Sequence, residues 1–537
     1  MKKKISLLLV LTLLLTLTGC DGIDLSWFAS RFRSPSQVEA EQTPVEQTPE
    51  EQPETKHIVT EVASEIKDYG LAFQPDYGLH PYNCVSLSNR VIFSFVYEPL
   101  FAVTTRFEPV PILAEGYEVS DDGLVTTVTL RKGISFHNGK SLTAADAVYS
   151  IESARDSAYY GSRFQALTGT AVIDEQTFTV STYNAYECVA LLLDIPVIPE
   201  GSTEQPQPVG TGPFYYEGTD RLVRNPDWWQ SGKPLADFPV IQLVSTTTTA
   251  DIRDQFEYEA VDLVLTDPNS AAYAGFHNDY ELWNQTTPVM QYIGYNLSSK
   301  VFSNYGLRGA ITYAIDRDTI VSELMNGFAQ SATLPCCESS GNYDAKLAGT
   351  FVYSLPNYHM QLNSAVVEDM DGDGVLDLYV PSLGYAVPVE GKMIVCSSSF
   401  QRVQAATQVV NTLNSLGFRL ELEALEFSEY QRALKNGNFD LYYGEVRLSN
   451  NFDLSPFFSY YGTLNYGSLP DSTMLNLCNL ALANSGNSYN LHKRLCERGY
   501  ITPVLFKSYA VYTTRGAVTD PTRYIDWFLP DLGEGIE

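Results

Sequence analysis

The sequence has few positive charges for its length. Only 34 lysines and arginines stand against 64 aspartates and glutamates in 537 residues, which gives a formal net charge of −30. Because nucleic acids and anionic lipid surfaces attract proteins through clustered cations, this balance argues against both as partners. Charged residues make up 18% of the chain and hydrophobic residues 44%, so most of it can bury a core and fold.

The sequence also lacks the motifs of common hydrolases and nucleotide-binding enzymes. Its six histidines form no HxxxH or HxH pair, and no Gly-x-Ser-x-Gly segment occurs. Residues 133–141 read Gly-Ile-Ser-Phe-His-Asn-Gly-Lys-Ser, one residue too long between the glycines for a phosphate-binding P-loop. Asn138-Gly139 predicts a β-hairpin turn there instead. We therefore expect neither enzymatic activity nor a cofactor.

Long hydrophobic runs are absent except near the amino terminus. Three lysines at positions 2–4 precede an apolar run over residues 5–17, which is shorter than the about 20 residues that span a membrane. The next residues, Leu17-Thr18-Gly19-Cys20, resemble a bacterial lipobox, where the leader is cut and the cysteine is lipidated. We expect a signal peptide over residues 1–19 and lipidation of Cys20; the alternative is an ordinary secretory signal with an incidental cysteine.

Residues 20–57 are expected to form a disordered acidic tether after the lipidated cysteine. Within them, residues 34–56 repeat proline, glutamate, glutamine and threonine and hold almost no apolar side chain. Such a segment cannot bury enough surface to offset its ordering entropy. This predicts a protein lipid-anchored on the extracytoplasmic face of the cell membrane, on a Gram-positive surface or otherwise in a periplasm.

The cysteines do not indicate a disulfide scaffold or a zinc site. No CxxC pair occurs among the eight, and a body of several hundred residues can form a core without cross-links. If Cys20 carries a lipid, seven cysteines remain, an odd number. The adjacent Cys336 and Cys337 are either ordinary thiols or a redox-active pair.

A β-α-β unit is predicted in the carboxyl-terminal half. Residues 392–396 form an apolar strand, apolar side chains recur at helical spacing from 403 to 416, and alternation resumes at 418–422. Gly417 stands where a glycine commonly ends a helix. Ligands of parallel sheets bind beyond the carboxyl ends of the strands, so the intervening residues are a candidate pocket loop, namely Ser397, Ser398, Ser399 and Phe400. The alternative is simple capping of the helix by serine.

An acidic loop imitates the start of an EF-hand. Its aspartates match positions 1, 3, 5 and 9 of a calcium-binding loop, but position 12 is Val380 where a bidentate glutamate is needed. The loop is therefore either a weak calcium site or an acidic surface turn; its aspartates are Asp369, Asp371, Asp373 and Asp377.

Short sequence blocks follow one another along the chain in a fixed order. They are Leu79-His80-Pro81, residues 97–101, 111–115, 120–146, 210–214 and 225–229, Tyr295-Asn296, and residues 307–310 and 314–317. Each is weak alone, but together they resemble the extracytoplasmic solute-binding proteins of family 5, the peptide and nickel import class that serves ABC importers. The resemblance covers about residues 70–530.

The resemblance implies an α/β, two-lobed fold of the periplasmic-binding-protein type, class II and cluster C, which closes on its ligand. The chain would pass from one lobe to the other near Asn296 and near Thr502, and these two crossings would form the hinge. The β-α-β unit then falls in lobe two. The implied boundaries are 58–297 with 500–537 for lobe one, 96–207 for an extra subdomain inserted in it, and 298–499 for lobe two.

The resemblance also implies ligand contacts. Family members with peptide ligands pair an extended segment after Leu-x-Pro with the peptide backbone. They also carry Gly-Trp-x-x-Asp, whose aspartate takes the peptide amino group; here the stretch is Gly444-Glu445-Val446-Arg447-Leu448. Either Glu445 takes the amino group and Arg447 a ligand carboxylate, or both form local salt bridges. The implied contacts are Val85, Ser86, Leu87, Ser88, Glu445, Val446 and Arg447.

We therefore expect a substrate-binding lipoprotein that captures oligopeptides or dipeptides outside the cell. It would act as a monomer and deliver its ligand to ABC permease subunits driven by cytoplasmic ATPases. One alternative is the same fold with a nickel chelate, an oligosaccharide or a signalling peptide as its ligand. Others are a surface adhesion or chaperone protein, and an exported enzyme, for which a nucleophile and base are missing.

Overall fold

The computed structural model describes residues 69–230, 238–268, 276–277, 279–467, 471–516 and 521–527. Residues Ser64–Glu537 form one compact unit. The predicted signal peptide, the lipidation site Cys20 and the tether lie outside the described residues. Among the helices that are described, none combines the length and the apolar character needed to cross a bilayer.

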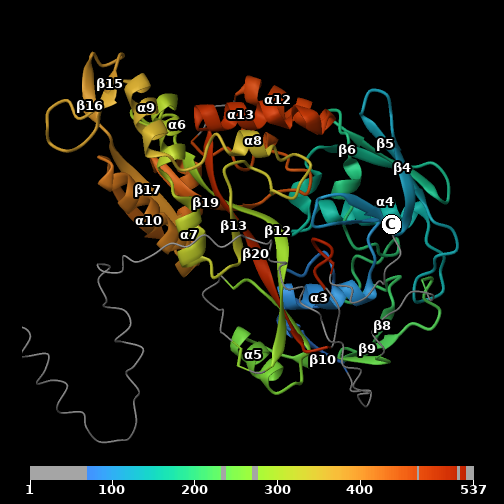
Figure 1. Cartoon of the computed structure of the whole chain (residues 1–537). Coiled ribbons are helices and arrows are strands. Elements are labelled where there is room, and N and C mark those ends of the chain that lie inside the picture. Colours follow the sequence, from blue (N-terminus) through green and yellow to red (C-terminus); the bar gives the residue numbers. More distant parts are fainter. Residues whose placement is uncertain are drawn as a thin grey trace, which may run out of the picture. The chain divides into compact units, whose positions relative to one another are not determined.

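An eleven-stranded mixed sheet runs through this unit (Figure 1). Ten strands follow one another across it, and β13 (Ala329–Ser331) pairs separately with β20. In spatial order the ten are β18 (Arg419–Leu425), β17 (Glu390–Cys396), β19 (Leu441–Arg447), β12 (Tyr280–Tyr295), β20 (Ile501–Thr514), β11 (Leu263–Thr266), β1 (Tyr69–Phe73), β10 (Val240–Ser245), β9 (Arg221–Arg224) and β8 (Phe214–Glu217).

Two long antiparallel strands, β12 and β20, form the middle of the sheet. Their ladder extends from Tyr280 opposite Thr514 to Gly294 opposite Ile501, with an irregularity at Thr287 and Pro288. Proline cannot donate to a ladder, which fits its place in a bulge. Residues 501–508 of β20 are all buried, as expected for a strand covered on both faces. Because β19 borders β12 and β11 borders β20, this pair joins the two parts of the sheet.

The first part of the chain adds a small sheet and several helices. Ser86 caps α3 by accepting a hydrogen bond from Asn89 N, so Leu87 and Ser88 are helical and the expected extended segment over residues 85–88 is wrong in its second half. The other elements are β2 (Phe101–Val103) paired with β3 (Pro109–Pro111), the sheet β4 (Ala114–Val119), β5 (Val125–Leu130), β7 (Thr177–Thr182) and β6 (Leu167–Val172), and the helices α3 (Leu87–Val96), α4 (Ala144–Arg155) and α5 (Thr249–Glu257).

The predicted turn at Asn138-Gly139 is confirmed. Gly139 has a positive φ of 80°, a conformation that glycine adopts at little cost. Phe136 N donates to Lys140 O at 2.8 Å, and Ser135 and Ser141 form an antiparallel bridge across the turn. This segment is therefore a tight hairpin.

The predicted β-α-β unit is also confirmed. Strands β17 and β18 pair in parallel, and α10 (Phe400–Ser415) connects them. Ser399 caps α10 by accepting a hydrogen bond from Arg402 N, which realises the capping alternative. Gly417, just beyond the helix, has a φ of 95°.

Replacing Gly417 by alanine is expected to lower the free energy of unfolding by about 1–2 kcal/mol, because a side chain resists positive φ. A Cβ atom there would also lie 2.9 Å from Leu376 Cγ. Urea denaturation measures the change. Gly341→Ala is the matched control, since a Cβ atom at Gly341 would meet no neighbour within 4 Å and its φ is not positive. Equal stability of the two variants would contradict the argument.

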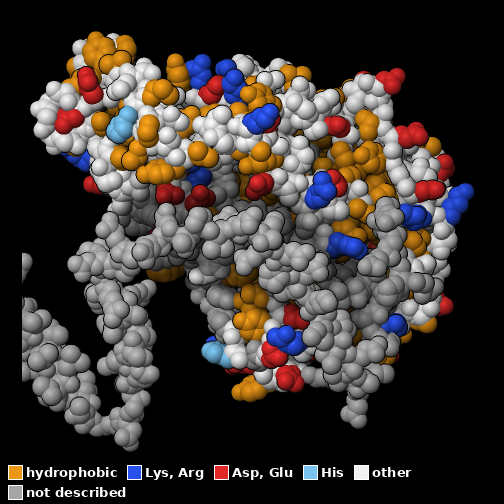
Figure 2. All heavy atoms as spheres, in the orientation of Figure 1, with side chains coloured by type: hydrophobic (Ala, Val, Ile, Leu, Met, Phe, Trp, Pro, Cys, Tyr) orange, Lys and Arg blue, Asp and Glu red, His pale blue; other side chains and the backbone are white. Residues whose placement is uncertain are grey.

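The second part of the chain carries most of the helices and a three-stranded sheet. Figure 2 shows hydrophobic side chains at the surface where α9, β15 and β16 lie in Figure 1. Val366 at the end of α9, Tyr379 in β15 and Tyr385 in β16 are each about half exposed. The elements are α6 (Tyr305–Ala314), α7 (Arg317–Leu324), α8 (Ala345–Ala348), α9 (Leu355–Ala365), β14 (Val367–Glu368), β15 (Asp377–Val380), β16 (Tyr385–Pro388), α11 (Phe427–Asn436), α12 (Ser472–Ala483) and α13 (Ser488–Arg498).

All seven cysteines after Cys20 are free thiols. Six are buried and Cys188 is half-buried. Burial raises the pKa of both Cys336 and Cys337, which keeps these adjacent thiols protonated and poorly nucleophilic. The geometry favours ordinary core thiols at this pair.

Candidate functional site

A cavity of about 410 Å³ lies between two parts of the chain that are far apart in sequence. One wall comes from residues between 162 and 186, and the other from residues between 446 and 482. Its charged lining residues are Arg163, Arg447 and Asp453. We name it the polar cavity. Its volume is in the range of small-molecule binding sites.

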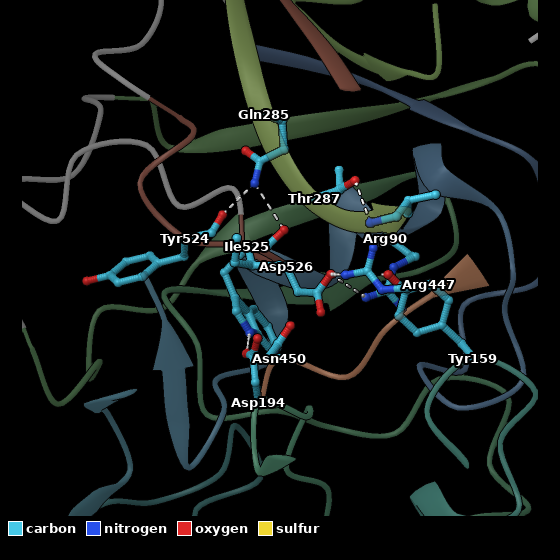
Figure 3. A network of polar contacts seen from close by, with 12 residues as sticks. Arg90, Tyr159, Asp194, Gln285, Thr287, Arg447, Asn450, Tyr524, Ile525 and Asp526 are labelled. Atoms are coloured by element: carbon cyan, nitrogen blue, oxygen red, sulfur yellow. Dashed lines mark hydrogen bonds and ion pairs between the residues drawn. The ribbon is translucent and has the colours of Figure 1, made fainter. Parts of the chain in front are cut away.

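Three arginines surround Asp526 beside this cavity, and Figure 3 shows two of them, Arg90 and Arg447. Arg447 Nη2 donates to Asp526 Oδ1 at 2.7 Å, and Arg163 Nη2 lies 3.3 Å from Oδ2. Arg90 Nη2 lies 4.0 Å from Oδ1. The Tyr159 hydroxyl donates to Oδ1 at 3.1 Å, and the Arg90 guanidinium lies 3.5 Å from the centre of the Tyr159 ring. We name the three arginines with Asp526 the arginine cluster.

Different elements bring the arginine cluster together. Arg90 is in the middle of α3, Arg163 is in the 3-10 helix η2 (Gly161–Phe164), and Arg447 ends β19. Asp526 follows a short carboxyl-terminal stretch that β12 holds in place. Gln285 Nε2 donates to the carbonyls of Tyr524 at 2.7 Å and Ile525 at 3.0 Å (Figure 3).

Burial and neighbouring charge shift the pKa values of the two carboxylates of this region, Asp526 and Asp194, in opposite directions. Burial alone would raise the pKa of Asp526, but Arg447, Arg90 and Arg163 hold it well below its ordinary value. Asp194, which accepts a hydrogen bond from Trp527 Nε1, is also buried. Burial and the nearby Asp526 raise the pKa of Asp194 to about 7. Asp526 is thus the stably ionised partner of the arginines.

Glu445 belongs to a second ionic network. Its carboxylate lies 3.3 Å from Lys507 Nζ and 3.6 Å from Arg402 Nη2, and it accepts a hydrogen bond from Gln291 Nε2 at 2.9 Å. Lys507 also pairs with Asp267. Burial alone would raise the pKa of Glu445, yet Lys507 and Arg402 lower it below its ordinary value. Glu445 is therefore an ionised member of a buried network.

The other candidate ligand contacts are dispersed. Val446 and Arg447 line the polar cavity, whereas Glu445 does not. Leu87 and Ser88 line a separate cavity of about 280 Å³, together with Asp267. Ser86 donates to Gln74 Oε1 at 2.6 Å, while Val85 is about half exposed. At the start of α10, Ser398 lies 3.2 Å from Cys396 Sγ and Phe400 is largely exposed.

Four residues of the site were missed by the sequence analysis: Arg90, Arg163, Asp453 and Asp526. Two carried a readable signal, because Arg90 directly precedes the largely apolar segment Val91–Val96 and Asp526 stands between Ile525 and Trp527. A lone charge in an apolar run is usually paired when it is buried. Asp453 faces Tyr186, whose hydroxyl lies 3.4 Å from its Oδ2, and burial raises its pKa.

The acidic loop has three of its four aspartates close together. Ligand atoms of Asp369, Asp371 and Asp373 lie within 4.8 Å of one another and are exposed. Asp377 accepts a hydrogen bond from Met370 N at 3.0 Å, and Asp373 pairs with Arg419 at 2.9 Å. Calcium binding here stays a prediction.

Comparison with known proteins gives a consistent result. The model of bacterial extracellular solute-binding proteins, family 5 Middle, matches residues 108–468. Oligopeptide-binding protein AppA of Bacillus subtilis (strain 168) is 25% identical over 354 residues, 61% of this chain and 63% of AppA. Glutathione-binding protein GsiB of Salmonella typhimurium is 28% identical over 272 residues, 48% of this chain and 53% of GsiB. The matches thus span between about half and two thirds of these relatives.

Solved structures show the fold. AppA from Bacillus subtilis in complex with a nonapeptide has a TM-score of 0.59 at 20% identity, over 86% of this chain and 99% of AppA. NikA from Brucella suis in complex with Fe(III)-EDTA has a TM-score of 0.66 at 17% identity, over 86% of this chain and 98% of NikA. CtaP from Listeria monocytogenes has a TM-score of 0.67 at 17% identity, over 88% of this chain and 100% of CtaP. The expected α/β, two-lobed fold is confirmed.

Proposed function

The chain belongs to family 5 of the bacterial extracellular solute-binding proteins, and from this membership we propose that it captures peptides outside the cell for an ABC importer. The family consists of extracytoplasmic transport proteins rather than enzymes. Oligopeptide- and glutathione-binding relatives support a peptide ligand. The polar cavity carries the proposal, because its cationic and acidic residues face one small-molecule-sized space.

We place the polar cavity between the two lobes. Lobe one would comprise residues 58–297 with 500–537, including the inserted subdomain at 96–207, and lobe two residues 298–499. Strands β12 and β20 would then carry the hinge. A ligand held by both lobes would shift the protein from open to closed, and the closed form would be recognised by the permease.

Direct contacts join the two walls beside the polar cavity and support this placement. Glu187 N donates to Leu482 O at 2.7 Å, and Ser485 N donates to Glu187 Oε2 at 2.6 Å. Asn184 Nδ2 donates to Asn479 Oδ1 at 3.2 Å. These hydrogen bonds would form when the lobes close and break when they open.

Arg447→Ala is expected to weaken ligand binding by about 1–3 kcal/mol, because it removes a charged donor from the cavity wall. Glu445→Ala breaks ion pairs with Lys507 and Arg402 that lie outside the lining of the polar cavity, and it is therefore expected to weaken binding less. Isothermal titration calorimetry measures both changes, with the ligand that mass spectrometry of the copurifying molecules identifies. Unchanged affinity in the Arg447→Ala variant would remove Arg447 from the site.

The proposed delivery route begins at the membrane. Lipidation of Cys20 would anchor the protein outside the cell, next to permease subunits that are powered by cytoplasmic ATPases. A Cys20→Ser variant would be released in soluble form, and its release into the medium or periplasm tests the anchor. We propose a monomer as the working unit.

Mass spectrometry of the small molecules that copurify with the Cys20→Ser protein is the decisive experiment for the function. The protein is purified gently from its host, denatured, and its released ligands are identified. Short peptides would establish peptide capture. A single non-peptide species, such as a metal chelate or an oligosaccharide, would replace the substrate but keep the transport role. Turnover of a bound peptide would overturn both and indicate an enzyme.

A further inference from the structure

The arginine cluster holds more positive charge than its carboxylates neutralise. Arg90 and Arg163 have side chains only 6% exposed, and Arg447 is 22% exposed. One stably ionised carboxylate, that of Asp526, lies among these three cations. Asp194 is the second acid of the region, and burial and the nearby Asp526 raise its pKa, so three arginines stand against two carboxylates. Buried charges are normally balanced by partners, and here a cationic excess remains.

Part of the arginine cluster still has hydrogen-bonding capacity. Among the described residues, Arg90 Nη1 is buried without a hydrogen-bond partner. Over the part of the chain that the structure describes, the Arg447 side chain makes one hydrogen bond, from Nη2 to Asp526. The same side chain lines the polar cavity. A guanidinium presents five N–H groups in a planar fork that matches a carboxylate. Arg447 therefore has donors to offer to a group inside the cavity.

One acid, Asp453, also lines the polar cavity, on the same wall as Arg447. Asp453 is held by Ser455, whose N and Oγ lie 2.8 and 3.0 Å from its carboxylate, and by the Tyr186 hydroxyl. Burial nevertheless raises the pKa of Asp453. The polar cavity thus has two arginines and one acid in its lining, and that acid is already bonded by Ser455 and Tyr186. This local charge is opposite to the net charge of the whole chain.

We propose that the polar cavity selects an anionic ligand, whose additional carboxylate binds Arg447 and Arg163. The proposal rests on the proposed capture function and deepens it, since a zwitterionic peptide without an acidic group would leave the cationic excess unmatched. Asp526 acts as a positioning residue, because it holds both guanidiniums at the cavity wall through its two oxygens. The carboxylate can come from a peptide side chain or from a free polycarboxylate.

The test is isothermal titration calorimetry on the full chain without its leader, in its Cys20→Ser form. The probes are the tripeptides Ala-Glu-Ala, Ala-Gln-Ala and Ala-Lys-Ala, and citrate as a polycarboxylate that is not a peptide. Ala-Glu-Ala is expected to bind at least tenfold more tightly than Ala-Gln-Ala, because a paired charge in a site of low dielectric contributes more than a neutral amide. Ala-Lys-Ala is expected to bind most weakly.

Substitutions assign the preference to the arginine cluster. Arg447→Gln should reduce the ratio between the glutamate and glutamine peptides to about threefold or less, whereas Arg447→Lys should retain part of it. The control is Arg432→Gln, which removes one positive charge from an exposed side chain on α11 that pairs with Glu429. It should leave the ratio unchanged. Thermal unfolding of each variant checks that the fold is kept.

The possible results distinguish anionic selectivity from the proposed peptide capture. Equal affinity for the glutamate and glutamine peptides, or a preference that survives Arg447→Gln, would overturn the anionic selectivity while peptide capture stands. Citrate binding that depends on Arg447, without binding of any tripeptide, would support the selectivity and overturn peptide capture. No binding of citrate and of all three tripeptides would overturn both.

Discussion

Replacing Asp526 by alanine is expected to lower the free energy of unfolding by about 3–5 kcal/mol. The substitution removes the carboxylate that lies within 4.0 Å of both Arg90 and Arg163, whose side chains are only 6% exposed. It also removes the acceptor of the Tyr159 hydroxyl. Urea denaturation at pH 7 measures the change.

Asp373→Ala is the matched control for this prediction. Asp373 also pairs with an arginine, Arg419 at 2.9 Å, but both side chains are about half exposed. Surface ion pairs contribute little, so the control should change stability by at most about 0.5 kcal/mol. A loss below about 1 kcal/mol for Asp526→Ala would show that water or the other acids neutralise the arginines instead.

Glu98 is expected to contribute more to the stability of the fold as the pH falls from 8 to 5. This side chain is fully buried and accepts hydrogen bonds from Trp228 and Gln230 on one oxygen and from Trp229 and Thr211 on the other. Burial outweighs these four donors and raises the pKa of Glu98 to about 7, from an ordinary value of 4.5.

The sign follows from proton binding. Between pH 4.5 and pH 7 the folded state holds a proton on Glu98 that the unfolded state has lost, so raising the pH through this window destabilises the fold. The full effect is about 3 kcal/mol, at 1.36 kcal/mol per pKa unit. This destabilisation is fully present above the pKa of Glu98 in the folded state and absent below its pKa in the unfolded state.

The measurement is the free energy of unfolding at pH 5, 6, 7 and 8, for the wild type and for Glu98→Gln. Asp194 has its pKa raised in the same range, so the wild type alone does not isolate Glu98. The difference between the two proteins does, because Asp194 is common to both. Parallel pH profiles would contradict the prediction.

Local patterns in the sequence predicted the elements that depend on neighbouring residues. The β-α-β unit follows from apolar spacing and the glycine at 417, and the turn at Asn138-Gly139 follows from the conformational freedom of Gly139. The resemblance to family 5 added the two lobes, which no single spacing reveals. The predicted extended conformation was wrong for Leu87 and Ser88, because Ser86 caps a helix that begins at Leu87, and the resemblance to the family outweighed this capping signal.

The arginine cluster could not be predicted from spacing. Its members lie at positions 90, 163, 447 and 526, on a helix, a 3-10 helix, a strand end and a carboxyl-terminal segment. Only the packing of these elements brings the charges together. For Arg447 the sequence offered a ligand carboxylate or a salt bridge; the structure shows the salt bridge, to Asp526, and leaves further donors of the same guanidinium toward the cavity.

The order of the strands in the central sheet bears on when this protein can fold during its synthesis. Strand β20 begins at residue 501 of 537, yet it lies between β12 and β11 and pairs with both. Until the ribosome has made nearly the whole chain, those strands lack the partner that joins them. The central sheet can therefore be completed only after β20 has been synthesised, late in the order of its strands.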